Sequence, residues 1–438
     1  MRRIGDGAYG SSVHGRTSTF ALRPAWNLDE QLYVLGVRYV VRMCEVIDPA
    51  TLLTVASSCV YMGSYLSLHT PVTTRKLRKD AGLDPNADED SDESQSLNSK
   101  SAWLFPVIGS AVLFSLYLAF KFLDREMLNL VLGAYFALTG CFALPTVLRQ
   151  SGIFFLGLDK VKAWQKNGFQ LDVSLVRTRR SQTSGESKEV ENKKNAWVHV
   201  SEHISLLFLV ILALVMVLLV GYMYTKHWVL ANVVAICFAV QAILLITLDS
   251  FTTGFILLGG LFFYDIFWVF GSTKVVGTSV MVNVAKNFDG PIKILSPNNI
   301  IEVVGAIAER GFHELPKLKF SLLGLGDIVI PGVFVALALR FDQMHASNKQ
   351  PSLDFTRYYY HFPKPYFTAS LAAYVGGLLT TMGVMHFFKA AQPALLYLSP
   401  ACALSVVFVA LVRGELHELG TWVDKSTEPL QVEEGKSD

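Results

Sequence analysis

Two long apolar stretches of this sequence each contain a single acidic residue, and that pattern constrains the fold more than any other. The stretch 251–270 contains Asp265, and the stretch 320–340 contains Asp327. Either stretch is long enough to cross a lipid bilayer as a helix at about 1.5 Å per residue. Because a carboxylate in hydrocarbon costs at least a few kcal/mol, an acidic residue inside a span indicates a functional site.

The composition also indicates a membrane protein. Hydrophobic residues make up 52% of the chain and charged residues only 17%, whereas soluble proteins average about 25% charged residues. The net charge of +2 argues against a nucleic-acid partner. The five cysteines show neither metal-ligand nor disulfide spacing, so we expect no metal and no cofactor.

Hydropathy predicts an all-α, polytopic membrane protein with about nine transmembrane helices. The predicted spans are 50–68, 102–123, 127–148, 204–224, 228–248, 251–270, 320–339, 367–388 and 391–412. The chain then divides into an N-terminal segment 1–47, spans one to six within 48–270, a connection 271–318, spans seven to nine within 319–412, and a tail 413–438. Residues 80–101 and 177–194 are polar and read as solvated loops.

Basic residues set the expected orientation. Lysines and arginines gather after the first and third spans, whereas the loops after the second, fourth and eighth spans contain few. The positive-inside rule then places the N-terminal segment and the 271–318 connection in the lumen, and the tail in the cytosol. Within this connection, the spacing over 300–310 predicts an amphipathic helix at the membrane surface.

The two acidic residues can meet, because consecutive spans run antiparallel. Counting about 1.5 Å per residue puts Asp265 roughly 7–8 Å and Asp327 roughly 10 Å from the same membrane face. Two adjacent carboxylates share a proton, which suits peptide-bond hydrolysis: the ionised one takes a proton from water and the protonated one hydrogen-bonds the scissile carbonyl. The sequence does not say which residue does which.

Two other functions use the same pair of residues. An ion or proton-coupled transporter can bind cations with paired carboxylates, and a membrane chaperone can hold helices without cleaving them. Other protease classes are not supported. His313-Glu314 and His417-Glu418 lack the second histidine of a zinc site. His386, the only histidine inside a predicted span and the only candidate partner for a buried serine, lies at an interface.

Residues around the two acids allow both structural and functional interpretations. Gly324 and Gly326 permit close backbone approach or tight helix packing next to Asp327. Tyr264 can hydrogen-bond near the acids or fill a helix interface. Residues 392–395 place a proline in the first turn of the last span, where proline is structurally tolerated.

Taken together, these segments resemble the presenilin-type intramembrane aspartyl proteases. Tyr264-Asp265, Gly324-Leu325-Gly326-Asp327 and Pro393-Ala394-Leu395 look like the YD, GxGD and PAL motifs, in the same order. The longer strings FYDIFWVFG, LLGLGDIVIPG and QPALLYLSPA are similar to the signal peptide peptidase branch. The resemblance extends from the first span to Glu415.

The resemblance implies a presenilin-like fold, Asp265 and Asp327 as the catalytic pair, and Gln392, Pro393, Ala394 and Leu395 as a loop that lines the active site and binds substrate. It implies residence in the endoplasmic reticulum membrane, with a lumenal N-terminus and a cytosolic C-terminus. The implied substrates are signal-peptide remnants, tail-anchored proteins and other type II-oriented membrane helices, and relatives often form homo-oligomers. A helix must unwind before cleavage, so we expect the enzyme to pair the unwound strand with an extended segment near Pro393 or in the 271–318 connection.

Overall fold

The computed structural model describes residues 50–84, 95–156, 170–176, 199–277, 279–288, 290–297, 320–351, 355–388 and 392–426, and most of these residues are helical. Eight described helices are long and apolar enough to cross a membrane, and a shorter apolar helix, Ala50–Leu66, precedes them. The eight spans lie in α3 (Ser99–Phe122), α4 (Arg125–Leu156), α6 (Leu206–Thr225), α7 (Trp228–Leu245), α8 (Phe251–Ile266, with the span continuing to Lys274), α12 (Gly326–Lys349), α13 (Pro365–Phe388) and α14 (Leu395–Arg413). The prediction of a helical polytopic membrane protein is confirmed.

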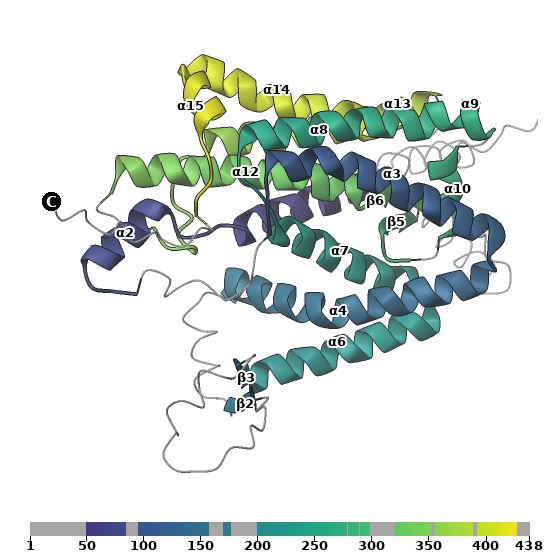
Figure 1. Ribbon diagram of the computed structural model, residues 1–438, viewed down its shortest axis with the longest axis horizontal. Coiled ribbons are helices and arrows are strands. Elements are labelled where there is room, and N and C mark those ends of the chain that lie inside the picture. The colour runs from purple at the N-terminus through teal and green to yellow at the C-terminus, as the bar shows by residue number, and fades with distance from the viewer. Residues whose placement is uncertain are drawn as a thin grey trace, which may run out of the picture.

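The long helices lie roughly along one direction, and the shorter elements gather at the two ends of this bundle (Figure 1). One end contains α2 (Val72–Asp80), α15 (Leu416–Thr421) and the antiparallel pair β2 (Gln170–Val176) and β3 (His199–Ser205). The opposite end contains α9 (Ser272–Val276), α10 (Val280–Asn287), β5 (Lys293–Pro297) and β6 (Phe320–Gly324). A short parallel pair joins β1 (Gln95–Leu97) to β4 (Ile246–Leu248).

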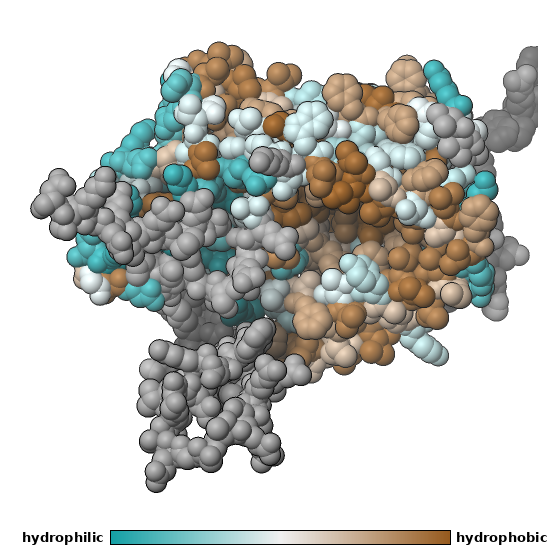
Figure 2. All heavy atoms as spheres, viewed as in Figure 1, coloured by the Kyte–Doolittle hydropathy of each residue, from teal (hydrophilic) through white to brown (hydrophobic). Residues whose placement is uncertain are grey.

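α12 lies at the centre of the bundle and α3, α4 and α6 lie at its periphery. Side chains are buried over 78% of the span in α12, against 11% in α3 and 17% in both α4 and α6. Hydrophobic residues accordingly cover the middle of the molecular surface, while hydrophilic residues gather toward its ends (Figure 2). An apolar surface of this size is suited to lipid rather than to water.

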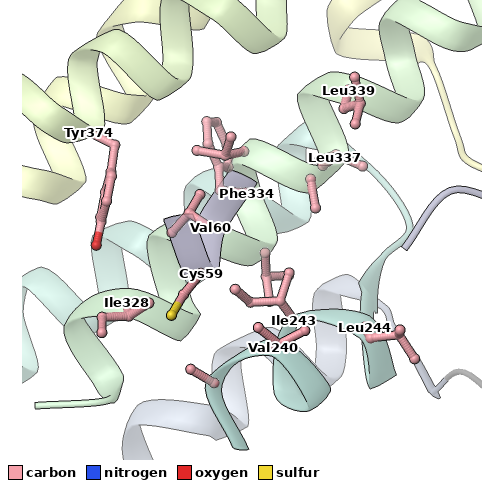
Figure 3. Packing of buried hydrophobic residues seen from close by; sticks show 14 of the residues in the cluster. Cys59, Val60, Val240, Ile243, Leu244, Ile328, Phe334, Leu337, Leu339 and Tyr374 are labelled. Carbon is pink, nitrogen blue, oxygen red and sulfur yellow. The ribbon is translucent and has the colours of Figure 1, made fainter. Parts of the chain in front are cut away.

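Small residues bring the central helices close together. A Cβ atom built on Gly332 of α12 would lie 2.7 Å from the Ile243 side chain of α7, and one on Gly254 of α8 would lie 2.7 Å from the ring of Phe334. Ile243, Phe334 and Val60, from the helix Ala50–Leu66, are fully buried in the same apolar core (Figure 3). The absence of side chains at these glycines therefore sets how closely α8 and α7 approach α12.

The seventh span differs from its prediction. Residues 320–324 form strand β6 and the helix begins only at Gly326, so Asp327 lies in the first helical turn and not about 10 Å deep. An apolar run of this length fits a strand or a helix equally well, and pairing with β5 decides for the strand. The helix also continues past residue 339, and it buries Arg340 and Asp342 with 4% and 2% exposure.

Residues 415–426, which we call the C-terminal strap, connect α12 to the start of α8. The Asp424 carboxylate lies 3.2 Å from Nε of the buried Arg340 of α12. The Asp424 N–H donates to the carbonyl of Asp249 at 2.7 Å, and Val423 forms a β-bridge with Ser250, the cap residue of α8. The strap therefore holds the two acid-bearing helices together at the end where α8 begins and Arg340 lies.

Three predicted features lie outside the described residues: the N-terminal segment 1–47, the amphipathic helix over 300–310 and the polar loop 177–194. The loop predicted over 80–101 is described in part, since α2 runs to Asp80 and α3 begins at Ser99. In the 271–318 connection, the described residues form α9, α10 and β5.

Candidate active site

Asp265 lies in the last turn of α8, where the helix changes its winding. Its side chain is buried, with 2% exposure, and α8 continues directly into the π-helical turn η1 (Phe267–Gly271). The Ser272 hydroxyl donates to the carbonyl of Trp268 across this turn at 2.6 Å. Short π-helical turns of this kind are frequent at functional sites.

Asp327 is presented by the junction between β6 and α12. Gly324 pairs with Lys293 in the β5–β6 hairpin, and the Leu325 N–H donates to the carbonyl of Ile292 at 2.9 Å. A Cβ atom on Gly324 would lie 3.5 Å from Oδ2 of Asp327. Neither Gly324 nor Gly326 has a positive φ, so at Gly324 the missing side chain matters for the space beside the carboxylate.

The loop 392–395 contacts the first of the two acids directly. The Leu395 N–H donates a hydrogen bond to Oδ2 of Asp265 at 3.3 Å. Leu395 is the first residue of α14, and Pro393 and Ala394 precede the helix. Pro393, Ala394 and Leu395 are buried and Gln392 is half-buried. An N–H in the first turn of a helix has no partner within that helix, so Asp265 supplies one.

The three motif segments thus come together from distant parts of the chain. α8 packs against α12 and α14, and α12 also packs against α14. Asp327 interacts electrostatically with Asp265. Carboxyl groups that approach each other closely can share one proton, so that one is a base while the other is an acid. Among the described residues, no group of three or more His, Cys, Asp or Glu side chains is arranged to hold a metal ion.

Tyr264 and Gly260 pack against α3 in this structure. A Cβ atom on Gly109 of α3 would lie 3.7 Å from the Tyr264 ring, and one on Gly260 would lie 2.8 Å from Pro106 of α3. Gly259 has no atom within 4 Å of such a Cβ. Tyr264 and Gly260 therefore fit the interface between α3 and α8, which was one of the two interpretations of Tyr264.

Sequence reasoning missed one buried polar residue near the acids, Tyr374 of α13. Its side chain has 0% exposure, and it interacts electrostatically with Asp327. A tyrosine in an apolar helix has no local pattern that distinguishes it from core packing. Only the packing of α13 against α12 reveals its position.

Comparisons with known proteins identify the family of this chain. A family model described as signal peptide peptidase matches residues 89–426. The chain is 37% identical to the signal peptide peptidase of Homo sapiens over 351 residues, which cover 79% of each protein. It is 38% identical to the signal peptide peptidase of Mus musculus over 353 residues, covering 80% of this chain and 79% of the mouse protein. Intramembrane protease 2 of Caenorhabditis elegans is 42% identical over 228 residues, covering 50% of this chain and 44% of that protein.

Proposed function

The chain belongs to the signal peptide peptidase family of intramembrane aspartyl proteases, and from that premise we propose that Asp265 and Asp327 are its catalytic pair. The observation that carries this proposal is the hydrogen bond from the Leu395 N–H to Asp265. It brings the PAL-like segment against the first acid, on a helix that also packs against α12, which contains the second acid. No packing requirement of apolar helices would place these three segments around one buried and one half-buried carboxyl group.

The same hydrogen bond supports different roles for the two acids. A backbone N–H that donates to a carboxylate favours its ionised form, which supports Asp265 as the base. Asp265 takes a proton from water while the water oxygen bonds to the scissile carbonyl carbon, and Asp327 gives its proton to the carbonyl oxygen. In the second step the diol returns a proton to Asp327, Asp265 protonates the amine, and the C–N bond breaks.

The β5–β6 hairpin supplies the extended segment that an unwound substrate needs. β6 leads directly into Gly324, and its side chains alternate between faces: Leu323 is buried, whereas Phe320 and Leu322 are 38% and 50% exposed. We expect the substrate to add a strand beside this hairpin, so that its backbone groups stay hydrogen-bonded during cleavage. Substrates with small or helix-breaking residues near the cleaved bond are then cut faster than leucine-rich helices.

For the substrates, we propose signal-peptide remnants, tail-anchored proteins and other type II-oriented helices of the endoplasmic reticulum membrane. Two relatives bear the name signal peptide peptidase. The charge pattern supports a lumenal N-terminus and a cytosolic C-terminus. The described elements fit this arrangement: α2 and the C-terminal strap lie at one end of the bundle and β5 and β6 at the other (Figure 1).

The direct test uses the purified protein in proteoliposomes with a synthetic signal-peptide remnant. Asp265→Asn and Asp327→Asn should each abolish cleavage and still retain the substrate, because neither change removes the apolar binding surface. Continued cleavage by either variant would refute the catalytic pair. Loss of substrate retention along with cleavage would instead indicate that the acids act in binding.

A further inference from the structure

The Tyr374 hydroxyl is buried in the bundle without a hydrogen-bond partner. Tyr374 lies in the middle of α13, its side chain has 0% exposure, and its Oη atom forms no hydrogen bond in the described part of the structure. Buried hydroxyl groups are nearly always hydrogen-bonded, because an unpaired one loses its bonds to water and gains nothing. The Tyr374 hydroxyl is therefore available to a hydrogen-bond acceptor that comes within reach during the reaction.

The surroundings of Tyr374 indicate which partner that is. The residue interacts electrostatically with Asp327, Cys402 of α14 and Cys59 of the helix Ala50–Leu66. Figure 3 shows its hydroxyl directed from α13 toward the beginning of α12, where Ile328 follows Asp327. A thiol is a weak hydrogen-bond acceptor, so the carboxyl group of Asp327 is the strongest acceptor among these neighbours.

The two acids are held unequally. Asp265 accepts the Leu395 N–H, whereas Asp327 forms no side-chain hydrogen bond within the described residues. Asp327 thus lacks a donor where Tyr374 lacks an acceptor. We propose that Tyr374 is the positioning residue of Asp327, and that its O–H donates to the Asp327 oxygen that does not carry the transferred proton. This inference rests on the proposed role of Asp327 as the acid.

The chemistry requires such a residue. A protonated carboxyl group has two unlike oxygens, and only the O–H oxygen can protonate the scissile carbonyl. A donor on the other oxygen fixes which one faces the substrate. Because Tyr374 acts through Asp327 and not on the substrate, its loss affects the chemical step more than substrate binding.

The test is Tyr374→Phe, which removes one oxygen atom, with Tyr366→Phe as its matched control. Tyr366 is also buried on α13, but its hydroxyl donates to Glu415 at 2.7 Å, far along the helix from the acids. Tyr374→Phe should lower kcat about tenfold, the loss of one hydrogen bond, with KM and melting temperature unchanged. Tyr366→Phe should lower the melting temperature and leave kcat unchanged.

The outcomes separate this inference from the proposed function. An unchanged kcat in Tyr374→Phe, or a fall in kcat that follows a fall in melting temperature, would overturn the positioning role. If Asp327→Asn is inactive while Tyr374→Phe is unaffected, the catalytic pair stands and only the inference fails. If Asp327→Asn cleaves normally, the proposed function fails first.

Discussion

The close contact between α8 and α12 predicts that one methyl group far from the acids will slow catalysis. In Gly254→Ala, the new Cβ would lie 2.7 Å from Cδ2 and 2.9 Å from Cε2 of the Phe334 ring. Phe334 is 1% exposed and lies between Phe251 and Phe255, so its ring cannot turn away freely. The helices must therefore move apart.

The size of this movement follows from the contact distances. An ordinary Cβ contact begins at 3.4 Å, so the contact must lengthen by about 0.7 Å from its 2.7 Å. Overpacking of this kind costs about 1–3 kcal/mol of stability. A displacement approaching 1 Å can lower the rate of a catalytic step by up to about 100-fold. We expect kcat to fall by at least about tenfold, because Asp265 and Asp327 belong to these same two helices.

The assay is initial-rate cleavage of a membrane-embedded substrate in proteoliposomes, together with the melting temperature in detergent. Gly259→Ala is the matched control, because Gly259 lies on the same helix and a Cβ atom built there meets no atom within 4 Å. The cleavage rate of this variant should be unchanged. Phe334→Leu should partly restore the rate of Gly254→Ala by making room for the methyl group. A normal rate in Gly254→Ala, or equal losses in Gly254→Ala and Gly259→Ala, would refute the reasoning.

Three further predictions concern charge and space. Asp424→Asn leaves the buried guanidinium of Arg340 without its carboxylate and should destabilise the protein by about 3–5 kcal/mol; an unchanged melting temperature would contradict this. Burial, together with the charge of Arg340, lowers the pKa of the His69 imidazole to about 3. An unfolded histidine binds its proton near pH 6.5, so above that pH His69 does not lower the free energy of unfolding. Below it, the free energy of unfolding should fall by about 1.4 kcal/mol per pH unit, down to about pH 3. Melting curves at pH 6.5 and 5.5 measure this slope, which His69→Gln should reduce. Gly324→Ala places a methyl group 3.5 Å from Oδ2 of Asp327 and should lower kcat several-fold by excluding water from the space beside that oxygen. Its free energy of unfolding should stay within about 1 kcal/mol of the parent. A normal kcat would show that catalysis does not need this space.

The sequence predicted the membrane-spanning helices well because the signal is local. Hydropathy over about 20 residues reflects the thickness of a bilayer, so α7, α8 and α13 begin within two residues of their predicted positions. The same signal failed at Phe320, where an apolar strand looks like the start of a helix. The decisive fact is the pairing with Lys293–Pro297, which depends on residues distant in the sequence.

The candidate site was predicted as a set of motifs, but its contacts were not. Asp265 and Asp327 were evident because each is an isolated acid in an apolar run. The Leu395 N–H is a backbone group, and no side-chain pattern shows where it points. Tyr374 was missed because a single buried residue in an apolar helix has no sequence pattern that distinguishes it from other core residues. Arg340 was missed because the predicted span ended where its side chain is buried.

The C-terminal strap joins α8 and α12 at one end, and the two acids lie at the other end of the same helices. Phe251, beside the strap, and Asp265 are 14 residues apart, and Asp327 and Arg340 are 13 apart, so each acid lies about 20 Å from the joined end. At that radius, a rotation of about 3° changes the separation of the acids by about 1 Å. Whatever binds or alters residues 415–426 can thus tune hydrolysis from the opposite side of the bilayer without approaching the reacting bond.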